Sequence, residues 1–177
     1  MTVFETERLS LRRFTLDDAE FILTLVNEPS FLRYIGDKKV RNLEDARQYI
    51  LNGPVASYER NGFGLYKIEL KESRTPIGMC GLLKREELPE PDIGFSLLPD
   101  FWSKGFAFEA AAAVLQDASE TLGLERILAI TNVDNEASIA LLERLGFAFD
   151  RLIQMPDGQQ LKLFFLATKR HKKDKPS

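Results

Sequence analysis

Residues 100–113 read DFWSKGFAFEAAAA, and they join a short polar turn to the start of an alanine-rich helix. The first N–H groups of a helix have no partner within the helix, and the helix dipole places partial positive charge beside them. Gly105 lets an anion approach the main chain without a Cβ in the way, and Lys104 adds a full charge. The stretch therefore predicts an anion site, although packing alone would also account for its aromatic residues.

Length and composition indicate one domain over residues 1–168, since 177 residues with 44% hydrophobic content can bury a sizeable core. No apolar run reaches the roughly 18 residues that span a bilayer, and residues 1–10 lack a signal-peptide pattern. We therefore expect no membrane partner and a cytoplasmic protein.

Charge is divided unevenly along the chain. The net charge is −3, but the end of the chain, KRHKKDKPS at residues 169–177, has five Lys or Arg and one Asp, which leaves residues 1–168 at −7. A nucleic-acid-binding protein needs a basic face to neutralise phosphates, so we expect no direct nucleic-acid partner. The basic tail is expected to be disordered.

Cysteine and histidine are too scarce for several kinds of site. Cys80 is the only cysteine, in the apolar stretch PIGMCGLL, and is expected to be buried in a strand. His171 is the only histidine and lies in the tail. The sequence thus predicts neither a disulfide, a His/Cys metal site nor a Ser-His-Asp triad.

The pattern of apolar residues predicts a mixed α/β fold. Alternation and turn signals predict strands at residues 8–14, 64–70, 76–83, 92–98, 126–131, 147–155 and 159–168. Helices are predicted from a cap at Thr15 to Asn27, closed by Pro29, and at residues 42–52, 54–58, 106–122 and 135–145. This order predicts a mixed, mostly antiparallel sheet with helices on both faces. The strands before and after the long helix should be parallel neighbours.

Four stretches resemble the GNAT acetyltransferases, and within them the RimJ/RimL type that acts on ribosomal-protein N-termini. They are ETERLSLRRFTLDDA (5–19), DIGFSLLPDFWSKGFAFEA (92–110), ITNVDNEASIALLERLGF (130–147) and the closing hairpin. The family's pyrophosphate pattern, Gln/Arg-x-x-Gly-x-Gly/Ala, reads Trp102 to Ala107 here, with Trp102 at the Gln/Arg position. The resemblance implies a GNAT fold whose sheet splays at its parallel pair.

The resemblance further implies that acetyl-CoA binds in this splay, with no metal. The turn at residues 103–107 would hold the pyrophosphate, and the unpaired strand edge would bind the pantetheine amides. Asn135 would reach the same arm, although it is an equally good helix N-cap. The implied cofactor-binding residues are Phe95, Leu97, Leu98, Trp102, Ser103, Lys104, Gly105, Phe106, Ala107, Asn132, Asn135 and Ser138.

The implied reaction is direct attack of a primary amine on the thioester, which requires a base, an oxyanion donor and stabilisation of the departing thiolate. The N–H of Leu97 is the expected oxyanion donor. Asp92 is the candidate base, although an ordinary carboxylate at the end of a strand explains it as well. Glu109 is a rival, but its position favours a role in complementing the helix dipole. Leu142 stands where many GNAT enzymes carry a tyrosine, so Ser138 is the expected hydroxyl near the sulfur.

The acceptor pocket is expected from residues 31–37, the helix around Tyr49 and the loop at 84–91. The glutamates of this loop could attract a cationic amine, although a solvated acidic loop is the more usual explanation. The resemblance favours a protein N-terminus, such as that of a ribosomal protein, as acceptor. A small-molecule amine (polyamine, amino acid or antibiotic) and a catalytically silent CoA-binding module are the alternatives. Exposed hairpin edges also allow a homodimer.

Overall fold

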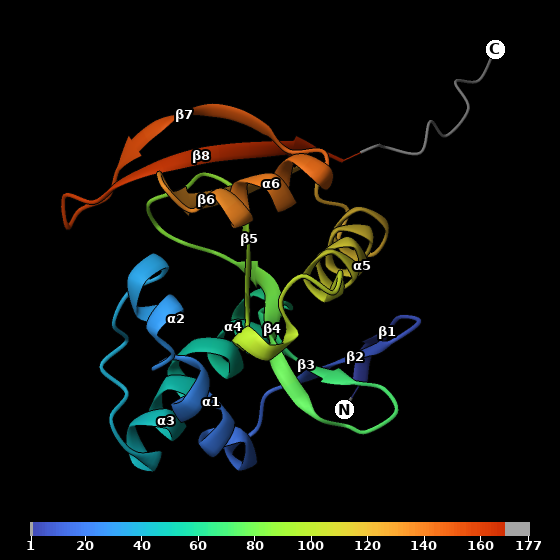
Figure 1. Cartoon of the computed structure of the whole chain (residues 1–177). Coiled ribbons are helices and arrows are strands. Elements are labelled where there is room, and N and C mark those ends of the chain that lie inside the picture. The colour runs from blue at the N-terminus through green and yellow to red at the C-terminus, as the bar shows by residue number, and fades with distance from the viewer. Residues whose placement is uncertain (1, 169–177) are drawn as a thin grey trace.

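The computed structural model describes residues 2–168, which fold around one eight-stranded sheet (Figure 1). The strand order is β1-β2-β3-β4-β5-β6-β8-β7, and every neighbouring pair is antiparallel except β5 and β6. The strands are β1 Thr2–Glu5, β2 Leu9–Arg13, β3 Leu65–Leu70, β4 Pro76–Leu83, β5 Asp92–Leu97, β6 Arg126–Asn132, β7 Ala148–Gln154 and β8 Gln160–Ala167. The predicted mixed sheet and its parallel pair are confirmed, whereas β1 was not predicted.

The parallel pair opens almost at once. β5 and β6 share a single paired position, Asp92 with Leu128, where the Leu128 N–H donates to the Pro91 carbonyl at 2.9 Å. On its other side β5 pairs with β4 over its whole length, from Leu83 with Asp92 to Gly78 with Leu97. The sheet is therefore continuous from β1 to β5, and β6 diverges from β5, as the family resemblance implies.

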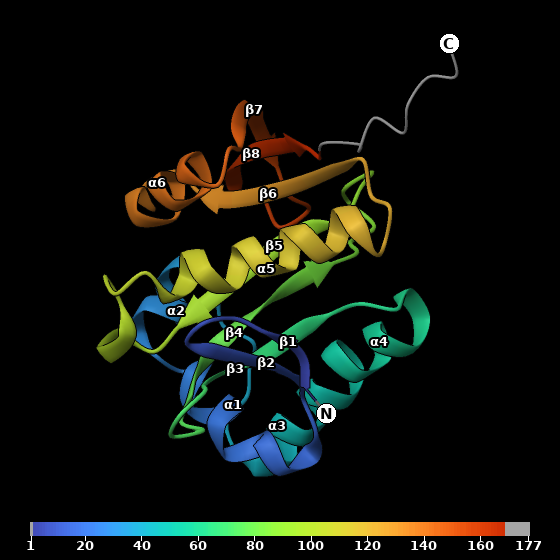
Figure 2. The same cartoon turned by 90° about the vertical axis from the view of Figure 1, so that its right-hand side faces the viewer.

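Helices cover both faces of the sheet (Figures 1 and 2). They are α1 Ala19–Leu25, α2 Pro29–Tyr34, α3 Leu43–Ile50, α4 Ala56–Asn61, α5 Phe106–Glu120 and α6 Glu136–Arg144. On one face the small residues of α5, such as Ala111 and Val114, pack on the sheet. On the other, Ile22 of α1 and Ile50 of α3 pack against Met79. The apolar core thus lies in two layers with the sheet between them.

The segment predicted as one helix from Thr15 to Asn27 is instead a 3₁₀ turn, Leu16–Asp18, followed by α1. The Thr15 N–H donates to the Asp18 carboxylate at 2.9 Å, as in a capping box. Pro29 does not merely follow the helix but opens α2, because the first helical position needs no N–H and suits the φ of proline. This unpredicted helix carries two aromatic residues of the site.

The helical path also continues through Gly53 and Pro54, where the sequence predicted an interruption. A π-helical turn, Leu51–Val55, joins α3 to α4 and contains Pro54. The wider i→i+5 spacing of such a turn accommodates a residue without an N–H inside a continuous helical path.

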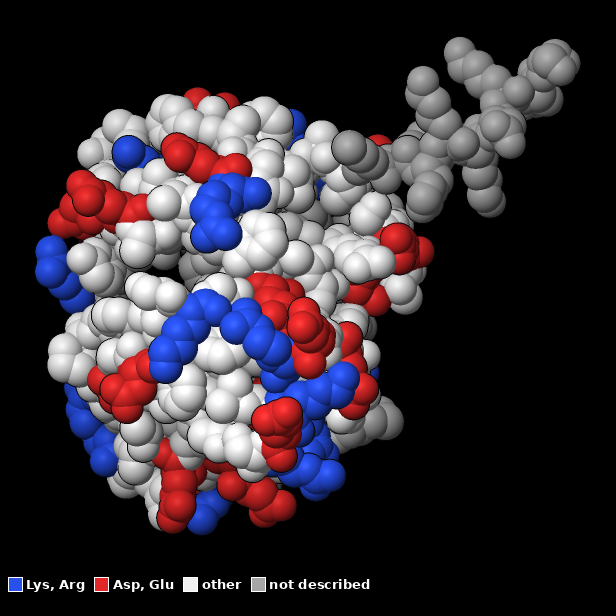
Figure 3. Space-filling view, turned by 45° about the vertical axis from the view of Figure 1, so that its right-hand side comes forward, with Lys and Arg blue, Asp and Glu red and all other residues white. Residues whose placement is uncertain are grey.

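The surface charge, the helices and the arrangement of metal-ligating side chains do not indicate a particular binding partner. Acidic and basic side chains are interspersed on the face drawn in Figure 3. Within residues 2–168 no helix has the length and apolar character needed to cross a membrane, and no group of three His, Cys, Asp or Glu side chains is arranged to hold a metal ion. The predicted disordered tail, residues 169–177, lies outside the described residues.

Candidate active site

The turn before α5 has the conformation that an anion site needs. Gly105 is the N-cap of α5 with φ +81°, and Ser103 also has a positive φ, +59°. No side chain caps the helix, and the first N–H bonded within the helix region is that of Glu109, which donates to the Gly105 carbonyl at 3.1 Å. The N–H groups of the three residues before Glu109 are therefore available to an anion.

An N-terminal latch, which we define as Thr6, Arg8 and Glu109, holds this turn in place. Glu109 accepts a hydrogen bond from the Thr6 hydroxyl at 2.5 Å, from the Arg8 N–H at 3.0 Å and from the Arg8 Nε at 2.7 Å. Burial pushes the pKa of Glu109 upward, but these hydrogen bonds outweigh it and hold the pKa below its usual value. Glu109 is thus a paired carboxylate rather than a free base.

Arg8 connects the latch to the anion turn itself. Its Nη1 donates to the Lys104 carbonyl at 2.9 Å, and its guanidinium lies 4.3 Å from the centre of the Phe106 ring. A Cβ added at Gly105 would lie 3.3 Å from Arg8 Nη2. Arg8 therefore holds the main chain just before Gly105 and contacts the side chain just after it.

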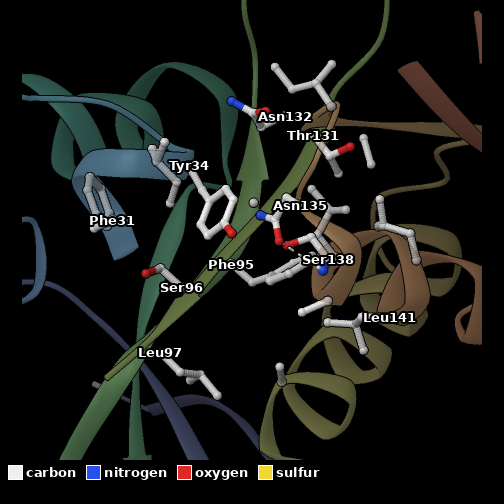
Figure 4. A pocket seen from close by; sticks show the side chains of 18 of the residues that line it. Phe31, Tyr34, Phe95, Ser96, Leu97, Thr131, Asn132, Asn135, Ser138 and Leu141 are labelled. Atoms are coloured by element: carbon white, nitrogen blue, oxygen red, sulfur yellow. Dashed lines mark hydrogen bonds between the residues drawn. The ribbon is translucent and has the colours of Figure 1, made fainter. Parts of the chain in front are cut away.

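A cavity of about 880 Å³ runs from this turn through the splay of the sheet. Residues of β5, β6, α2, α6 and the turn before α5 line it, as Figure 4 shows for part of its wall. The volume is within the range of cofactor and small-molecule sites. Its walls bring together segments that are far apart in the sequence.

The edge of β5 that faces the cavity has unused main-chain groups. The Leu98 N–H donates to the Ile77 carbonyl at 2.8 Å, so the main chain of Leu98 faces β4. Because alternate residues of a strand direct their N–H and C=O groups to opposite sides, those of Phe95 and Leu97 face the splay. The Leu97 carbonyl accepts from the Trp102 indole at 2.9 Å, which leaves the Leu97 N–H and both groups of Phe95 for a ligand.

The opposite wall, at the start of α6, also offers polar atoms. The Asn135 side-chain carbonyl accepts from the Ser138 N–H at 3.3 Å, so Asn135 is an N-cap, while its amide NH₂ makes no hydrogen bond within residues 2–168. The buried hydroxyl of Thr131 has no partner either among these residues. Figure 4 shows Asn135 and Ser138 facing Phe95 and the Tyr34 ring across the cavity. Capping and ligand binding by Asn135 are therefore compatible.

The other end of the cavity is aromatic and basic. Phe31 and Tyr34 of α2, Tyr49 of α3 and the cations Lys38 and Arg85 line it. All three segments predicted for the acceptor pocket contribute to this end of the cavity. The loop at 84–91 contributes Arg85 to the cavity wall, whereas none of its glutamates lines the cavity.

Asp92 lies between this end and the splay. Its side chain is only 1% exposed, and Arg85 Nε donates to both carboxylate oxygens, at 3.0 and 3.1 Å. Burial raises the pKa of Asp92 to about 6, against the opposing effect of Arg85. A carboxylate that titrates near neutral pH can exchange a proton there.

Cys80, by contrast, is fully buried in β4, and burial raises the pKa of its thiol to about 12. A thiol with so high a pKa cannot act as a nucleophile.

Most residues predicted for the site lie together in this cavity. Those that line it are Asp92, Phe95, Leu97, Trp102, Ser103, Gly105, Phe106, Ala107, Asn132, Asn135 and Ser138. Leu98 and Lys104 lie outside the lining. Leu142 is 1% exposed and packs in the core, so the place of the family tyrosine is filled by an apolar side chain.

Sequence reasoning missed the latch and the cation Lys38. Arg8 was assigned only to the polar face of a strand, and nothing in its immediate neighbours indicates a partner about a hundred residues away. Lys38 falls one residue beyond the segment predicted for the acceptor pocket. For Lys38 a signal was present, since it follows directly on a segment that already carried an aromatic cluster.

Comparison with known proteins agrees with this geometry. The model of the acetyltransferase (GNAT) domain matches residues 8–148. The chain is 34% identical to the uncharacterized N-acetyltransferase YoaA of Bacillus subtilis over 147 residues, which are 82% of each chain.

Solved structures extend the likeness to the whole fold. An acetyltransferase from Agrobacterium tumefaciens superposes with a TM-score of 0.81 at 26% identity over 95% of each chain. RimL, a ribosomal L7/L12 α-N-protein acetyltransferase solved with coenzyme A, superposes with a TM-score of 0.82 at 17% identity, over 94% of this chain and 98% of its own. The chain belongs to the GNAT family, and it is an acetyl-CoA-dependent N-acetyltransferase.

Proposed function

We propose that this enzyme transfers the acetyl group directly to a primary amine while both substrates occupy the cavity, and that the amine is the α-amine of a protein N-terminus. The observation that carries the direct transfer is the meeting of three features in one cavity: the uncapped start of α5, the unpaired edge of β5 and the basic, aromatic acceptor end. No cysteine or histidine is placed for a covalent acetyl-enzyme among residues 2–168, since Cys80 is buried.

In this proposal the cofactor is held mainly by the main chain. The pyrophosphate accepts hydrogen bonds from the N–H groups between Gly105 and Phe108, and the helix dipole favours its charge. The pantetheine amides pair with Phe95 along the free edge of β5 as an added strand would. The amide of Asn135 and the orphaned hydroxyl of Thr131 supply further partners. Acetyl-CoA supplies the thioester, and the chain supplies the groups that orient it.

For the chemical step we assign one group to each task. The Leu97 N–H stabilises the oxyanion, because it faces the splay and has no partner in the sheet. Asp92, whose pKa lies near 6, accepts the proton of the attacking amine through a chain of water molecules, because about 16 Å of β5 separates it from Leu97. Ser138 donates its hydroxyl hydrogen bond to the departing thiolate. A thiol pKa of about 8 to 9 makes the thiolate a moderate leaving group, so full protonation is unnecessary.

The choice of a protein N-terminus rests on the sequence resemblance to the RimJ/RimL type and on the likeness in fold to RimL. Acetylation of a small-molecule amine is the second candidate, and the enclosed aromatic pocket of Phe31, Tyr34 and Tyr49 favours it. The predicted homodimer stays a prediction; β1 and β7 are the outer strands at which such pairing would occur.

A thiol-release assay with acetyl-CoA tests the proposal. N-terminal peptides and small amines are offered in parallel, and mass spectrometry locates the acetyl group on each product. Peptide products acetylated only at the α-amine would support the proposal. Transfer to small amines but not to peptides would favour the second candidate. Binding of acetyl-CoA without transfer to any amine would instead identify a silent CoA-binding module.

A further inference from the structure

Two cations at the acceptor end of the cavity have unused hydrogen-bond donors, although Arg85 is ion-paired with Asp92 through its Nε. The Lys38 ammonium makes no hydrogen bond or ion pair within residues 2–168. Arg85 uses only its Nε, which donates to Asp92, and its two terminal amino groups make no hydrogen bond to the described part of the chain. A guanidinium that is fixed at one edge presents the other edge as a fork of donors. Both side chains line the same cavity.

Among the acidic residues nearby, Asp92 pairs with Arg85, and none forms an ion pair with Lys38 within residues 2–168. Asp37, next to Lys38 in sequence, pairs with Arg41 at 2.5 Å. Asp92 is buried and is in contact with one edge of Arg85. The other carboxylates of the lining, Asp134, Glu136 and Asp157, belong to the α6 wall and the β7–β8 turn, and none forms an ion pair with Lys38 or Arg85.

The two cations are also close enough to affect each other. Lys38 is solvent-accessible, yet surrounding protein atoms and the positive charge of Arg85 lower its pKa. Two like charges on one pocket wall cost free energy unless an anion lies between them. A carboxylate or phosphate would receive a charge-assisted hydrogen bond from each side chain and remove the repulsion. A polyamine would add further positive charge and be disfavoured.

We propose that the acceptor carries an anionic group, a carboxylate or a phosphate, beside its amine, and that Lys38 and the free edge of Arg85 bind this group. Phe31, Tyr34 and Tyr49 enclose the apolar part of the same acceptor. The inference rests on the proposed transfer to an amine and narrows its substrate class. It also disfavours the role in which the glutamates of the loop at 84–91 attract a cationic amine.

Matched peptides test the inference without changing the reacting amine. One set is the peptide series Ser-X-Ala-Ala-amide, with X as Glu, phosphoserine, Gln or Lys. A second set is the pair phenylalanine and phenylalaninamide, which differ in the free carboxylate. We expect kcat/KM to be about tenfold higher for the anionic member of each pair, as for a close charge pair at a recognition site. The Glu and phosphoserine arms distinguish carboxylate from phosphate, and the free amino acid distinguishes a small acceptor from a peptide.

Substitutions assign the preference to a residue. Lys38→Gln should reduce the preference for the anionic peptide, with the free edge of Arg85 accounting for what remains, and Lys38→Glu should reduce it further, toward the Lys peptide. Lys39→Gln is the matched control, since Lys39 is exposed and does not line this cavity. We avoid Arg85 as the test position because its loss would leave Asp92 buried without a partner.

The outcomes separate the inference from the proposed function. Acetyl transfer that is indifferent to X and to Lys38→Gln would overturn the anionic acceptor and leave the N-acetyltransferase reaction standing. Failure to acetylate any member of the series, despite acetyl-CoA binding, would count against the proposed reaction and the inference together. A preference that persists unchanged in Lys38→Glu would also overturn the assignment.

Discussion

The two ends of the cavity are built in different ways. At the cofactor end, main-chain groups of the α5 turn and the β5 edge face the cavity, and Arg8 is paired with Glu109. At the acceptor end the walls are side chains from α2, α3 and two loops, among them Lys38, which has no partner within residues 2–168, and Arg85, which is paired with Asp92 through one edge. A main-chain site tolerates sequence change, whereas a side-chain site changes its specificity with each substitution. The difference explains how one fold can keep its cofactor while its acceptors vary.

The largest effect is expected from a change in the main chain at the cofactor end. Gly105→Val should raise the KM for acetyl-CoA by about 100-fold or more, because a β-branched residue resists a φ of +81° and the first N–H groups of α5 would turn away from the pyrophosphate. Initial-rate kinetics over a range of acetyl-CoA concentrations measure it.

Gly62→Val is the matched control for this variant. Gly62 has φ +77° at the end of α4, and nothing lies within 4 Å of a Cβ placed there, so the backbone strain is similar and the site is untouched. If both variants change the KM equally, the effect of Gly105 is strain and not the anion turn.

The next effect concerns the wall that faces the thioester. Ser138→Ala should lower kcat by about tenfold to 100-fold, at the lower end of what a positioned proton donor contributes. Binding of acetyl-CoA should be retained, because the Asn135 cap accepts from the main-chain N–H of residue 138 and survives the change. Turnover equal to that of the unchanged enzyme would remove Ser138 from the mechanism.

The pH dependence sharpens the assignment of Asp92. With a pKa near 6, Asp92 is protonated at lower pH and cannot accept the proton of the amine. The logarithm of kcat/KM for the acceptor should rise with a slope of about 2 below pH 6 and about 1 from there to the pKa of the amine. Asp92→Asn should lower the rate and show the slope of about 1 throughout. The same break near pH 6 in this variant would assign the ionisation elsewhere.

The smallest effect is expected from the latch, because it acts on the cofactor through the turn. Arg8→Gln and Glu109→Gln should each raise the KM for acetyl-CoA by about threefold to tenfold at unchanged kcat, since partly exposed charge pairs contribute modestly. The double variant should be no worse than the stronger single one, as expected for residues that act as a unit. Arg12→Gln on β2, the strand that begins just after Arg8, is the control, and an equal rise there would refute a specific role for Arg8.

The same contrast explains what the sequence could predict. The parallel pair follows from strand periodicity and the alanine-rich helix, and the splay follows from the family resemblance; both are confirmed in the fold. The anion site at Gly105 stays a prediction, although the turn has the conformation that such a site needs. The helix α2 was missed because Pro29 marks an end as readily as a beginning. For the loop at 84–91 the sequence left two roles open for the glutamates, and the structure favours the solvated loop, because Arg85 and not a glutamate lines the cavity. Such a choice depends on tertiary packing, which local sequence does not encode.

Thermal unfolding with and without acetyl-CoA is the most direct test of the main-chain cofactor site. At about 100 times Kd the ligand should add about 2.7 kcal/mol, which corresponds to a Tm rise of roughly 5 to 10 °C for a chain of this size. We predict this rise for the unchanged enzyme and for Gly62→Val, a much smaller one for Gly105→Val, and little effect of ADP or NAD on any of them. No rise at millimolar acetyl-CoA, or an equal rise in Gly105→Val, would contradict the account.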